Sequence, residues 1–341
     1  MKCAVFHGRH QLRVEEREIP AVGPGQVLVQ VKACGVCGTD VHIYEGDKGA
    51  ANCPPGTVLG HEFSGVVEQT GEGVSRVKSG DRVCVDPNKL CGQCCYCQSG
   101  IGHFCESMVG IGTTVDGGFA QYCLVPKSQV YLIGEGIRFE EAAMAEPVSC
   151  CLHGIDLCEI GPGSRVAVIG GGMIGLIMLQ LARLAGASFT ALLEPVAEKR
   201  AMAQRLGADL VVDPFHEDAA QRLREAGVSR LDAVIECAGL PSTIAQAIEL
   251  AGKRSVVMMF GLTKPDDTVA IKPFEIFQKE VVLKASYINP YTMGRAVELI
   301  NRRRLDVSSM VCETAPLSML EEILASPALR AKGKYIIDPW K

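Results

Sequence analysis

The chain has 341 residues, of which 48% are hydrophobic and 21% are charged. At about 150 residues per domain this length predicts two domains, and the composition excludes an intrinsically disordered chain. The 34 basic and 39 acidic residues leave a net charge of −5, so no overall positive field would attract nucleic acid or an anionic membrane. No apolar run reaches the roughly 18 residues needed to span a bilayer. We therefore expect neither nucleic-acid nor membrane partners.

The chain contains sixteen cysteines, too many to be incidental. Residues 1–7 lose their apolar character too early for a secretory signal peptide. In a long chain without such a signal, cysteines are expected to be reduced thiols and metal ligands rather than a disulfide framework. The sequence therefore predicts a cytoplasmic protein.

Short β segments separated by glycines make up about the first 125 residues. The clearest of them cover residues 27–31, 65–68 and 81–85, and no long helical period occurs before about residue 139. This texture predicts an all-β domain with irregular loops.

From Gly161 onward, strands and helices alternate. The sequence predicts helices over residues 173–185 and 195–206, which end before Gly186 and Gly207. The predicted strands cover residues 165–169, 189–193, 210–212, 233–235, 256–260 and 281–283. Such βαβ units build a parallel sheet covered by helices on both faces, so the predicted fold class is α/β. A helix over residues 292–303 and a strand over residues 335–337 form a short tail.

The segment from Gly170 to Gly175 matches G-x-G-x-x-G, follows a predicted apolar strand and opens a predicted helix. Gly170 allows a tight turn, Gly172 lets the backbone approach a pyrophosphate, and Gly175 lets the helix pack against the strand. The first helical turn, with Met173 and Ile174, offers free N–H groups and the positive end of the helix dipole to phosphates. The segment therefore predicts a dinucleotide-binding turn.

Glu194 ends the second predicted strand, nineteen residues after Gly175. A carboxylate at this place accepts hydrogen bonds from the adenosine ribose and repels a 2′-phosphate, which favours NAD over NADP. Lys199 and Arg200 lie close by and are able to accommodate that phosphate. NADP therefore stays open as the alternative cofactor.

Four thiols occur within fifteen residues, at Cys91, Cys94, Cys97 and Cys105. Four thiolates at this spacing can surround one zinc ion tetrahedrally and leave no open position, which is typical of a structural site. Such a site cross-links a loop that is too poor in apolar residues to fold alone. The regular spacing excludes Cys95, and Lys89 is the only basic residue nearby, which argues against zinc-dependent nucleic-acid binding.

A second set of metal-ligating residues combines Cys37 with His61. A catalytic zinc takes three protein ligands and keeps one exchangeable position. Two carboxylates are candidates for the third place: Glu62, adjacent to His61, and Glu146, where the β-rich part gives way to the dinucleotide part. Glu146 also fits an ordinary acid in the first turn of a helix beside Pro147. The residues alone leave this choice open.

The residues that make the chain recognisable are Gly60-His61-Glu62-x2-Gly65-x5-Gly71-x2-Val74, the four cysteines, the glycine turn, and Cys37 with Thr39 and His42. Over essentially its full length the chain resembles the zinc-containing medium-chain dehydrogenases, most of all the sorbitol and polyol branch. The resemblance implies a GroES-like β-rich catalytic domain over residues 1–147, with a structural-zinc lobe at 88–106. A Rossmann cofactor-binding domain, a doubly wound parallel sheet, is implied over 148–285, and residues 286–341 return to the catalytic domain.

The resemblance also implies two zinc ions per chain and a homodimer or homotetramer. Cys37 and His61 would bind the catalytic zinc, with Glu146 as a ligand, directly or through its water, and Glu62 as a ligand or just behind one. The four lobe cysteines would bind the structural zinc. The arginine of the sorbitol enzymes is absent from the segment Ser286-Tyr287-Ile288-Asn289-Pro290, which argues against sorbitol and admits a sugar-alcohol phosphate.

The expected reaction is the NAD-linked oxidation of a secondary alcohol, such as a polyol or polyol phosphate, to a ketone. Zinc would lower the pKa of the alcohol, and Thr39 would pass its proton through the cofactor ribose to His42. Threonine dehydrogenase, which shares the glutamate at position 146, and other secondary-alcohol dehydrogenases are the nearest alternatives. A nucleotide-sensing protein without chemistry is the non-enzyme alternative, and it would be expected to lose the metal ligands, as would a zinc-free reductase.

Overall fold

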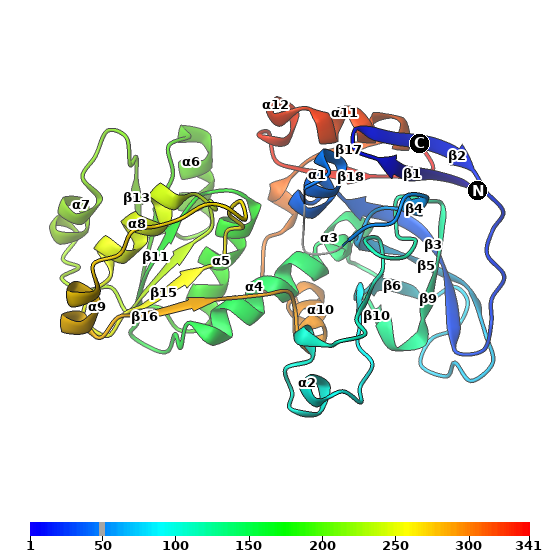
Figure 1. The fold of residues 1–341 in the computed structure, drawn as a ribbon, viewed down its shortest axis with the longest axis horizontal. Coiled ribbons are helices and arrows are strands. Elements are labelled where there is room, and N and C mark those ends of the chain that lie inside the picture. The colour runs from blue at the N-terminus through cyan, green and yellow to red at the C-terminus, as the bar shows by residue number, and fades with distance from the viewer. Residues whose placement is uncertain (48–51) are drawn as a thin grey trace. The chain divides into compact units, whose positions relative to one another are not determined.

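The protein was analysed as a computed structural model that describes residues 1–47 and 52–341. The chain forms two compact units (Figure 1): unit 1 is Met1–Ser149 with Asn289–Lys341, and unit 2 is Cys150–Ile288. Helix α4 (Ala145–Leu157) contains the first boundary between them. Within the described residues, none of the helices combines the length and the apolar character that a membrane span requires.

Unit 1 is rich in β structure. Its strands are β1 (Lys2–Gly8), β2 (Gln11–Glu16), β3 (Gln26–Gly35), β4 (Thr57–Val58), β5 (Glu62–Thr70), β6 (Arg82–Val85), β7 (Asn88–Lys89), β8 (Val109–Gly110), β9 (Tyr122–Pro126), β10 (Val130–Leu132), β17 (Val311–Ala315) and β18 (Lys334–Ile337). Its helices are α1 (Gly38–Glu45), α2 (Cys95–Gln98), α3 (Phe139–Ala143), α10 (Met293–Asn301), α11 (Leu320–Ala325) and α12 (Pro327–Arg330).

Strand β3 is the centre of the main sheet of unit 1. It pairs antiparallel with β5, β9 and β18. Its alternating residues Val27, Val29 and Val31 are fully buried, and each such side chain contributes roughly 1.5–3 kcal/mol by leaving water. The pairing with β18 places the tail of the chain beside β3, at the same end where Gly35 pairs with Glu62 of β5.

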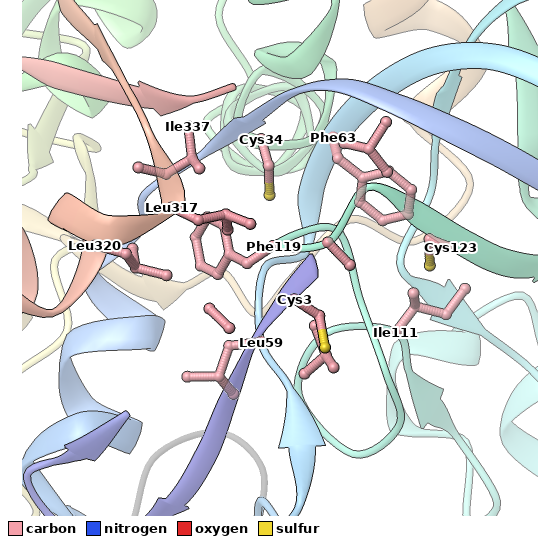
Figure 2. Close-up of a cluster of buried hydrophobic side chains, with 14 of the residues drawn as sticks. Cys3, Cys34, Leu59, Phe63, Ile111, Phe119, Cys123, Leu317, Leu320 and Ile337 are labelled. Atoms are coloured by element: carbon pink, nitrogen blue, oxygen red, sulfur yellow. The ribbon is translucent and has the colours of Figure 1, made fainter. Parts of the chain in front are cut away.

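The core of unit 1 gathers side chains from the whole length of the chain. Figure 2 shows Cys3 and Cys34 from the first strands beside Phe119 and, from the tail, Leu317 and Ile337. All five are at most 4% exposed. Because protein interiors are close-packed, residues from the two ends of the chain must both be present to complete this core.

Unit 2 alternates strands and helices. Its elements are β11 (Arg165–Ile169), α5 (Met173–Leu184), β12 (Phe189–Leu193), α6 (Ala197–Arg205), β13 (Leu210–Val212), α7 (Ala219–Glu225), β14 (Ala233–Glu236), α8 (Pro241–Leu250), β15 (Val256–Met259), α9 (Pro273–Lys279) and β16 (Val282–Ala285). All six strands are parallel, in the order β13-β12-β11-β14-β15-β16. This is the dinucleotide-binding order of the Rossmann fold. The predicted doubly wound sheet is therefore confirmed.

Some predicted elements were placed wrongly. An eight-residue helix, α1, occurs well before residue 139, inside the part whose sequence indicates only strands and loops. The helix expected from residue 195 begins at Ala197, because the Glu194 carboxylate accepts a hydrogen bond from the N–H of Val196 and keeps the chain extended there. The helix expected to reach residue 303 ends at Asn301, and Arg303 itself adopts a φ of 50°, which cannot continue a helix.

Candidate metal and cofactor sites

Cys37, His61 and Glu62 form a compact cluster in unit 1. One ligand atom from each lies within 4.8 Å of the other two. Cys37 is the N-cap of α1, while His61 and Glu62 stand at the start of β5. The turn into β5 needs Gly60, which has a φ of 95°, and where a Cβ would lie 2.8 Å from the backbone nitrogen of Phe119. The fold thus brings two separate loops to one point.

A carboxylate that the sequence analysis missed, Asp40, stands behind this cluster. Its Oδ1 lies 3.3 Å from Nδ1 of His61, and its Oδ2 accepts a hydrogen bond of 2.9 Å from the N–H of Cys37. Burial disfavours a charged His61, yet Asp40 and Cys37 raise the pKa of His61 well above its usual value. The surrounding groups therefore favour a positive charge at this point, with the Asp40 carboxylate lying beside the Nδ1 edge of the His61 ring.

Glu62 makes a buried ion pair with Lys334 of β18. The Lys334 ammonium donates to Oε2 of Glu62 and, at 2.8 Å, to the carbonyl of Val36. The Glu62 side chain is fully buried and that of Lys334 is 3% exposed. A side chain at Gly35 would overlap the Glu62 carboxylate, so glycine is required there. Among the described residues, no hydrogen-bond partner faces the other oxygen of Glu62, Oε1.

Replacement of Lys334 by methionine is expected to destabilise the protein by about 3–5 kcal/mol, because it leaves the Glu62 charge buried without a partner. The free energy of unfolding in urea measures this loss. The K334M/E62Q double variant should recover much of it, since the unpaired charge is then gone. Lys332, exposed and two residues away, provides the control K332M, which should be neutral. A loss below about 1 kcal/mol for K334M would contradict the assigned role.

The other residues predicted for this site are not all gathered into the cluster. Thr39 and His42 lie on α1, both half-buried, and Nδ1 of His42 is 3.1 Å from the carboxylate of Asp47. Glu146 lies in the first turn of α4 and is 8% exposed. The carboxylate grouped with Cys37 and His61 is Glu62 and not Glu146.

The four lobe cysteines also come together. Ligand atoms of Cys91, Cys94, Cys97 and Cys105 all lie within 4.8 Å of one another. Backbone N–H groups at positions 97 and 106 lower the pKa of the Cys94 thiol to about 6, whereas burial raises the pKa of Cys97 to about 12. Cys95 is exposed and outside this group. Four sulfur atoms this close together fit a closed tetrahedral zinc site.

The glycine turn of unit 2 has the geometry that a dinucleotide requires. Gly170 adopts a φ of 99°, and a Cβ on Gly175 would overlap the Gly170 carbonyl oxygen. A Cβ on Gly172 would meet no atom within 4 Å. Met173 and Ile174 begin α5, whose first N–H groups have no acceptor within the helix. The space at Gly172 and these free N–H groups together fit an approaching phosphate.

Glu194 is 5% exposed and serves the turn itself. Its Oε2 accepts a 2.6 Å hydrogen bond from the N–H of Gly171, in addition to the bond from Val196 through Oε1. Arg200 is folded back onto the carbonyl of Glu194 and pairs with Asp213 at 3.0 Å. Lys199 is half-buried in the first turn of α6. Of the two basic residues, Arg200 is thus already engaged by Glu194 and Asp213.

Two residues of the first cluster were missed by the sequence analysis, for different reasons. Asp40 carries a local signal, because it stands three residues after Cys37 at the N3 position of a helix, where an acid is favoured. Lys334 carries none, because it is 272 residues from Glu62 and only the pairing of β18 with β3 brings the two together.

Comparison with known families agrees with this geometry. Residues 23–135 match the alcohol dehydrogenase GroES-like domain, and residues 173–302 match the zinc-binding dehydrogenase domain. These two matches confirm the predicted GroES-like and Rossmann architecture.

Full-length relatives extend these matches. D-arabinitol dehydrogenase 1 of Uromyces fabae is 32% identical over 99% of this chain and 97% of its own. L-threonine 3-dehydrogenase of Caldanaerobacter subterraneus is 36% identical over 96% and 95%. A Sinorhizobium meliloti protein crystallised with NADP superposes with a TM-score of 0.95 at 37% identity, with 99% of each chain covered. The chain belongs to the zinc-containing medium-chain dehydrogenases, the family to which its sequence pattern points.

Proposed function

We propose that the protein oxidises a secondary alcohol, a polyol or polyol phosphate, to a ketone and transfers the hydride to NAD. The observation that carries the proposal is the cluster of half-buried Cys37 with buried His61 and Glu62, which supplies sulfur, nitrogen and oxygen donors within 4.8 Å of one another. A nucleotide-sensing protein without chemistry would have no use for such a cluster. The same chain also holds a dinucleotide turn in unit 2.

The donor set fits zinc. Sulfur, imidazole and carboxylate are the ligands that catalytic zinc takes in proteins, and the buried Oε1 of Glu62 lacks a partner among the described residues. Cys37 and His61 would hold the ion, with Glu62 or Glu146 as the third ligand, and the four lobe cysteines would hold a second ion. Zinc supplies Lewis acidity that lowers the pKa of a bound alcohol.

Side chains of the protein would transfer the proton of the substrate alcohol. In the proposed scheme the hydroxyl of Thr39 accepts the alcohol proton, and His42 delivers it to solvent. His42 suits that role because its side chain is 35% exposed and paired with Asp47. Asp40 keeps the His61 ring oriented throughout.

For the cofactor, the proposal is NAD. Glu194 supports it, because a buried carboxylate beside the glycine turn disfavours a 2′-phosphate, and because Arg200 is engaged elsewhere. The NADP bound to the Sinorhizobium meliloti protein favours NADP instead, so activity with the two cofactors has to be compared directly.

A single kinetic screen tests both parts of the proposal. The purified protein is assayed with simple secondary alcohols, pentitols, hexitols, their phosphates and L-threonine, each with NAD and with NADP. We expect the highest kcat/KM for a polyol or its phosphate with NAD. Preference for L-threonine would make the protein a threonine dehydrogenase, which the 36% identical relative keeps as the second candidate. No turnover on any alcohol would overturn the proposal.

We further propose that the protein acts as a homodimer or homotetramer in the cytoplasm. Strand β16 is the edge of the unit 2 sheet, and the nearby Phe274, Phe277 and Val282 are 67%, 77% and 45% exposed. Exposed apolar groups beside an open sheet edge favour association. The proposed location rests on the sixteen cysteines, which in a chain of this length are expected to be reduced thiols and metal ligands. Light scattering should give a multiple of the 36.4 kDa chain mass, and a mass of one chain would exclude the assembly.

A further inference from the structure

Asn289 lies at a boundary between the units along the chain, and its side chain is buried, with 2% exposure. It is the first residue of unit 1 after the chain returns from unit 2, and Ser149 is the last before the chain leaves. The Asn289 amide donates to Oγ of Ser149 at 2.8 Å and to Oδ1 of Asp86 at 3.3 Å. Its oxygen accepts a bond of 2.6 Å from Nδ2 of Asn88. The side chain of Asn289 therefore connects its own segment with two others of unit 1, residues 86–88 and the start of α4.

The connection continues to Glu146. The Ser149 hydroxyl, which accepts from Asn289, donates a 2.6 Å bond to the carbonyl of Glu146, one turn earlier in α4. Thr292 adds a second link, because its hydroxyl donates to the carbonyl of Ser149 at 2.7 Å. The returning segment thus bonds α4 twice at Ser149, and the Ser149 hydroxyl passes this contact on to the carbonyl of Glu146 in the first turn.

Two of the three partners of Asn289, Ser149 and Asp86, are buried, and Asn88 is half-buried. Ser149 is fully buried and Asp86 is 9% exposed, and burial raises the pKa of the Asp86 carboxyl to about 6. A buried polar group that loses its partner is costly, so the network has one favoured arrangement. The hydrogen bonds of the Asn289 side chain go to Asp86, Asn88 and Ser149.

We propose that Asn289 is a positioning residue that acts through Ser149 on the first turn of α4 and so sets the place of Glu146. The inference rests on the proposed function, in which Glu146 is a candidate zinc ligand. A small shift of a reacting group costs up to about 100-fold in rate. We therefore expect Asn289→Ala to lower kcat by about 10- to 100-fold, with the KM for NAD changed less than about 3-fold.

Two further variants frame the experiment. Ser149→Ala removes the hydroxyl that connects Asn289 to the carbonyl of Glu146 and changes the network less. This variant should also lower kcat, so it can replace Asn289→Ala if that variant folds poorly. Asn301→Ala is the matched control. The Asn301 side-chain oxygen also connects two segments of unit 1, because it accepts a 2.9 Å hydrogen bond from the N–H of Gly134, and this bond does not involve α4. We expect Asn301→Ala to leave kcat unchanged.

A double-mutant cycle with Glu146→Gln separates positioning from general loss of structure. If Asn289 acts through Glu146, Asn289→Ala should cost less than about 3-fold in the Glu146→Gln background. Equal losses in both backgrounds would overturn the inference, and so would an unchanged kcat in Asn289→Ala.

Hydrogen exchange of the peptide covering residues 144–150 gives a readout that does not need activity. Exchange there should quicken in Asn289→Ala and stay unchanged in Asn301→Ala. Unchanged exchange in Asn289→Ala would refute the inference even if the enzyme is active. A wild-type protein without activity on any alcohol, but with faster exchange in Asn289→Ala, would instead refute the proposed function and leave the network in place.

Discussion

Replacing Cys37 with alanine is expected to remove one of two zinc ions per chain and to lower kcat at saturating substrate by at least about 10³-fold. The physical reason is the loss of the sulfur donor of the cluster, which with His61 would hold the zinc ion, and with it the Lewis acidity that the ion would supply, worth several kcal/mol. Atomic absorption on the dialysed protein measures the zinc, and steady-state kinetics with NAD measures turnover. Circular dichroism should be unchanged, because Cys37 is only half-buried and lies outside the core.

Cys123 provides the control for this experiment. It is a buried thiol of β9, seen in the core of unit 1 in Figure 2 and outside both metal-ligand groups. Cys123→Ala should keep both zinc ions and most of the activity while costing some stability through lost packing. If Cys37→Ala kept full turnover, the cluster could not be the catalytic metal centre.

The second large effect is expected at the lobe. Cys94→Ser should lose the structural zinc and unfold the segment around residues 91–105, because that segment has few apolar contacts of its own. Metal binding in structural zinc sites contributes roughly 10–16 kcal/mol, and a site left with three thiolates forfeits a substantial part of this free energy. Zinc analysis should fall from two ions to one per chain, and limited proteolysis should cut the lobe in the variant and spare it in the wild type.

Cys95, the neighbour of Cys94, provides a closely matched control for Cys94→Ser. Cys95→Ser changes the same atom one position along, in a thiol that is exposed and outside the group of four. It should keep the zinc content and protease resistance of the wild type. Equal sensitivity of the two variants would mean that Cys95 shares in metal binding, and the four-ligand assignment would then be wrong.

Prediction from the sequence succeeded where the signal is local. The spacing of the lobe cysteines and of the glycine turn reflects geometry within a few residues: the four thiols lie close together and Gly170 has a positive φ, while their binding roles stay predictions. The parallel sheet of unit 2 followed from alternation of strands and helices. Helix α1 was not predicted, because eight residues are too few for a clear helical period. Its N-cap, Cys37, is also not one of the residue types that usually signal the start of a helix.

The rest could not be predicted, because it depends on contacts between residues far apart in the chain. Glu62 meets Lys334 across 272 residues, and Asn289 meets Ser149 across 140. No periodicity or spacing encodes such pairs, and only the sheet order and the return of the tail create them. The sequence analysis gave Asn289 no role, and only the structure brings its side chain to Ser149, Asp86 and Asn88.

The return of the tail to β3 has a consequence for how the protein is made. Unit 2 is one uninterrupted stretch, so it can fold while the ribosome is still translating the remainder. Unit 1 is completed later, since Leu317, Ile337 and the Lys334 ammonium that pairs with Glu62 are synthesised only after the whole of unit 2. In the growing chain, unit 2 can therefore complete its core before unit 1 does.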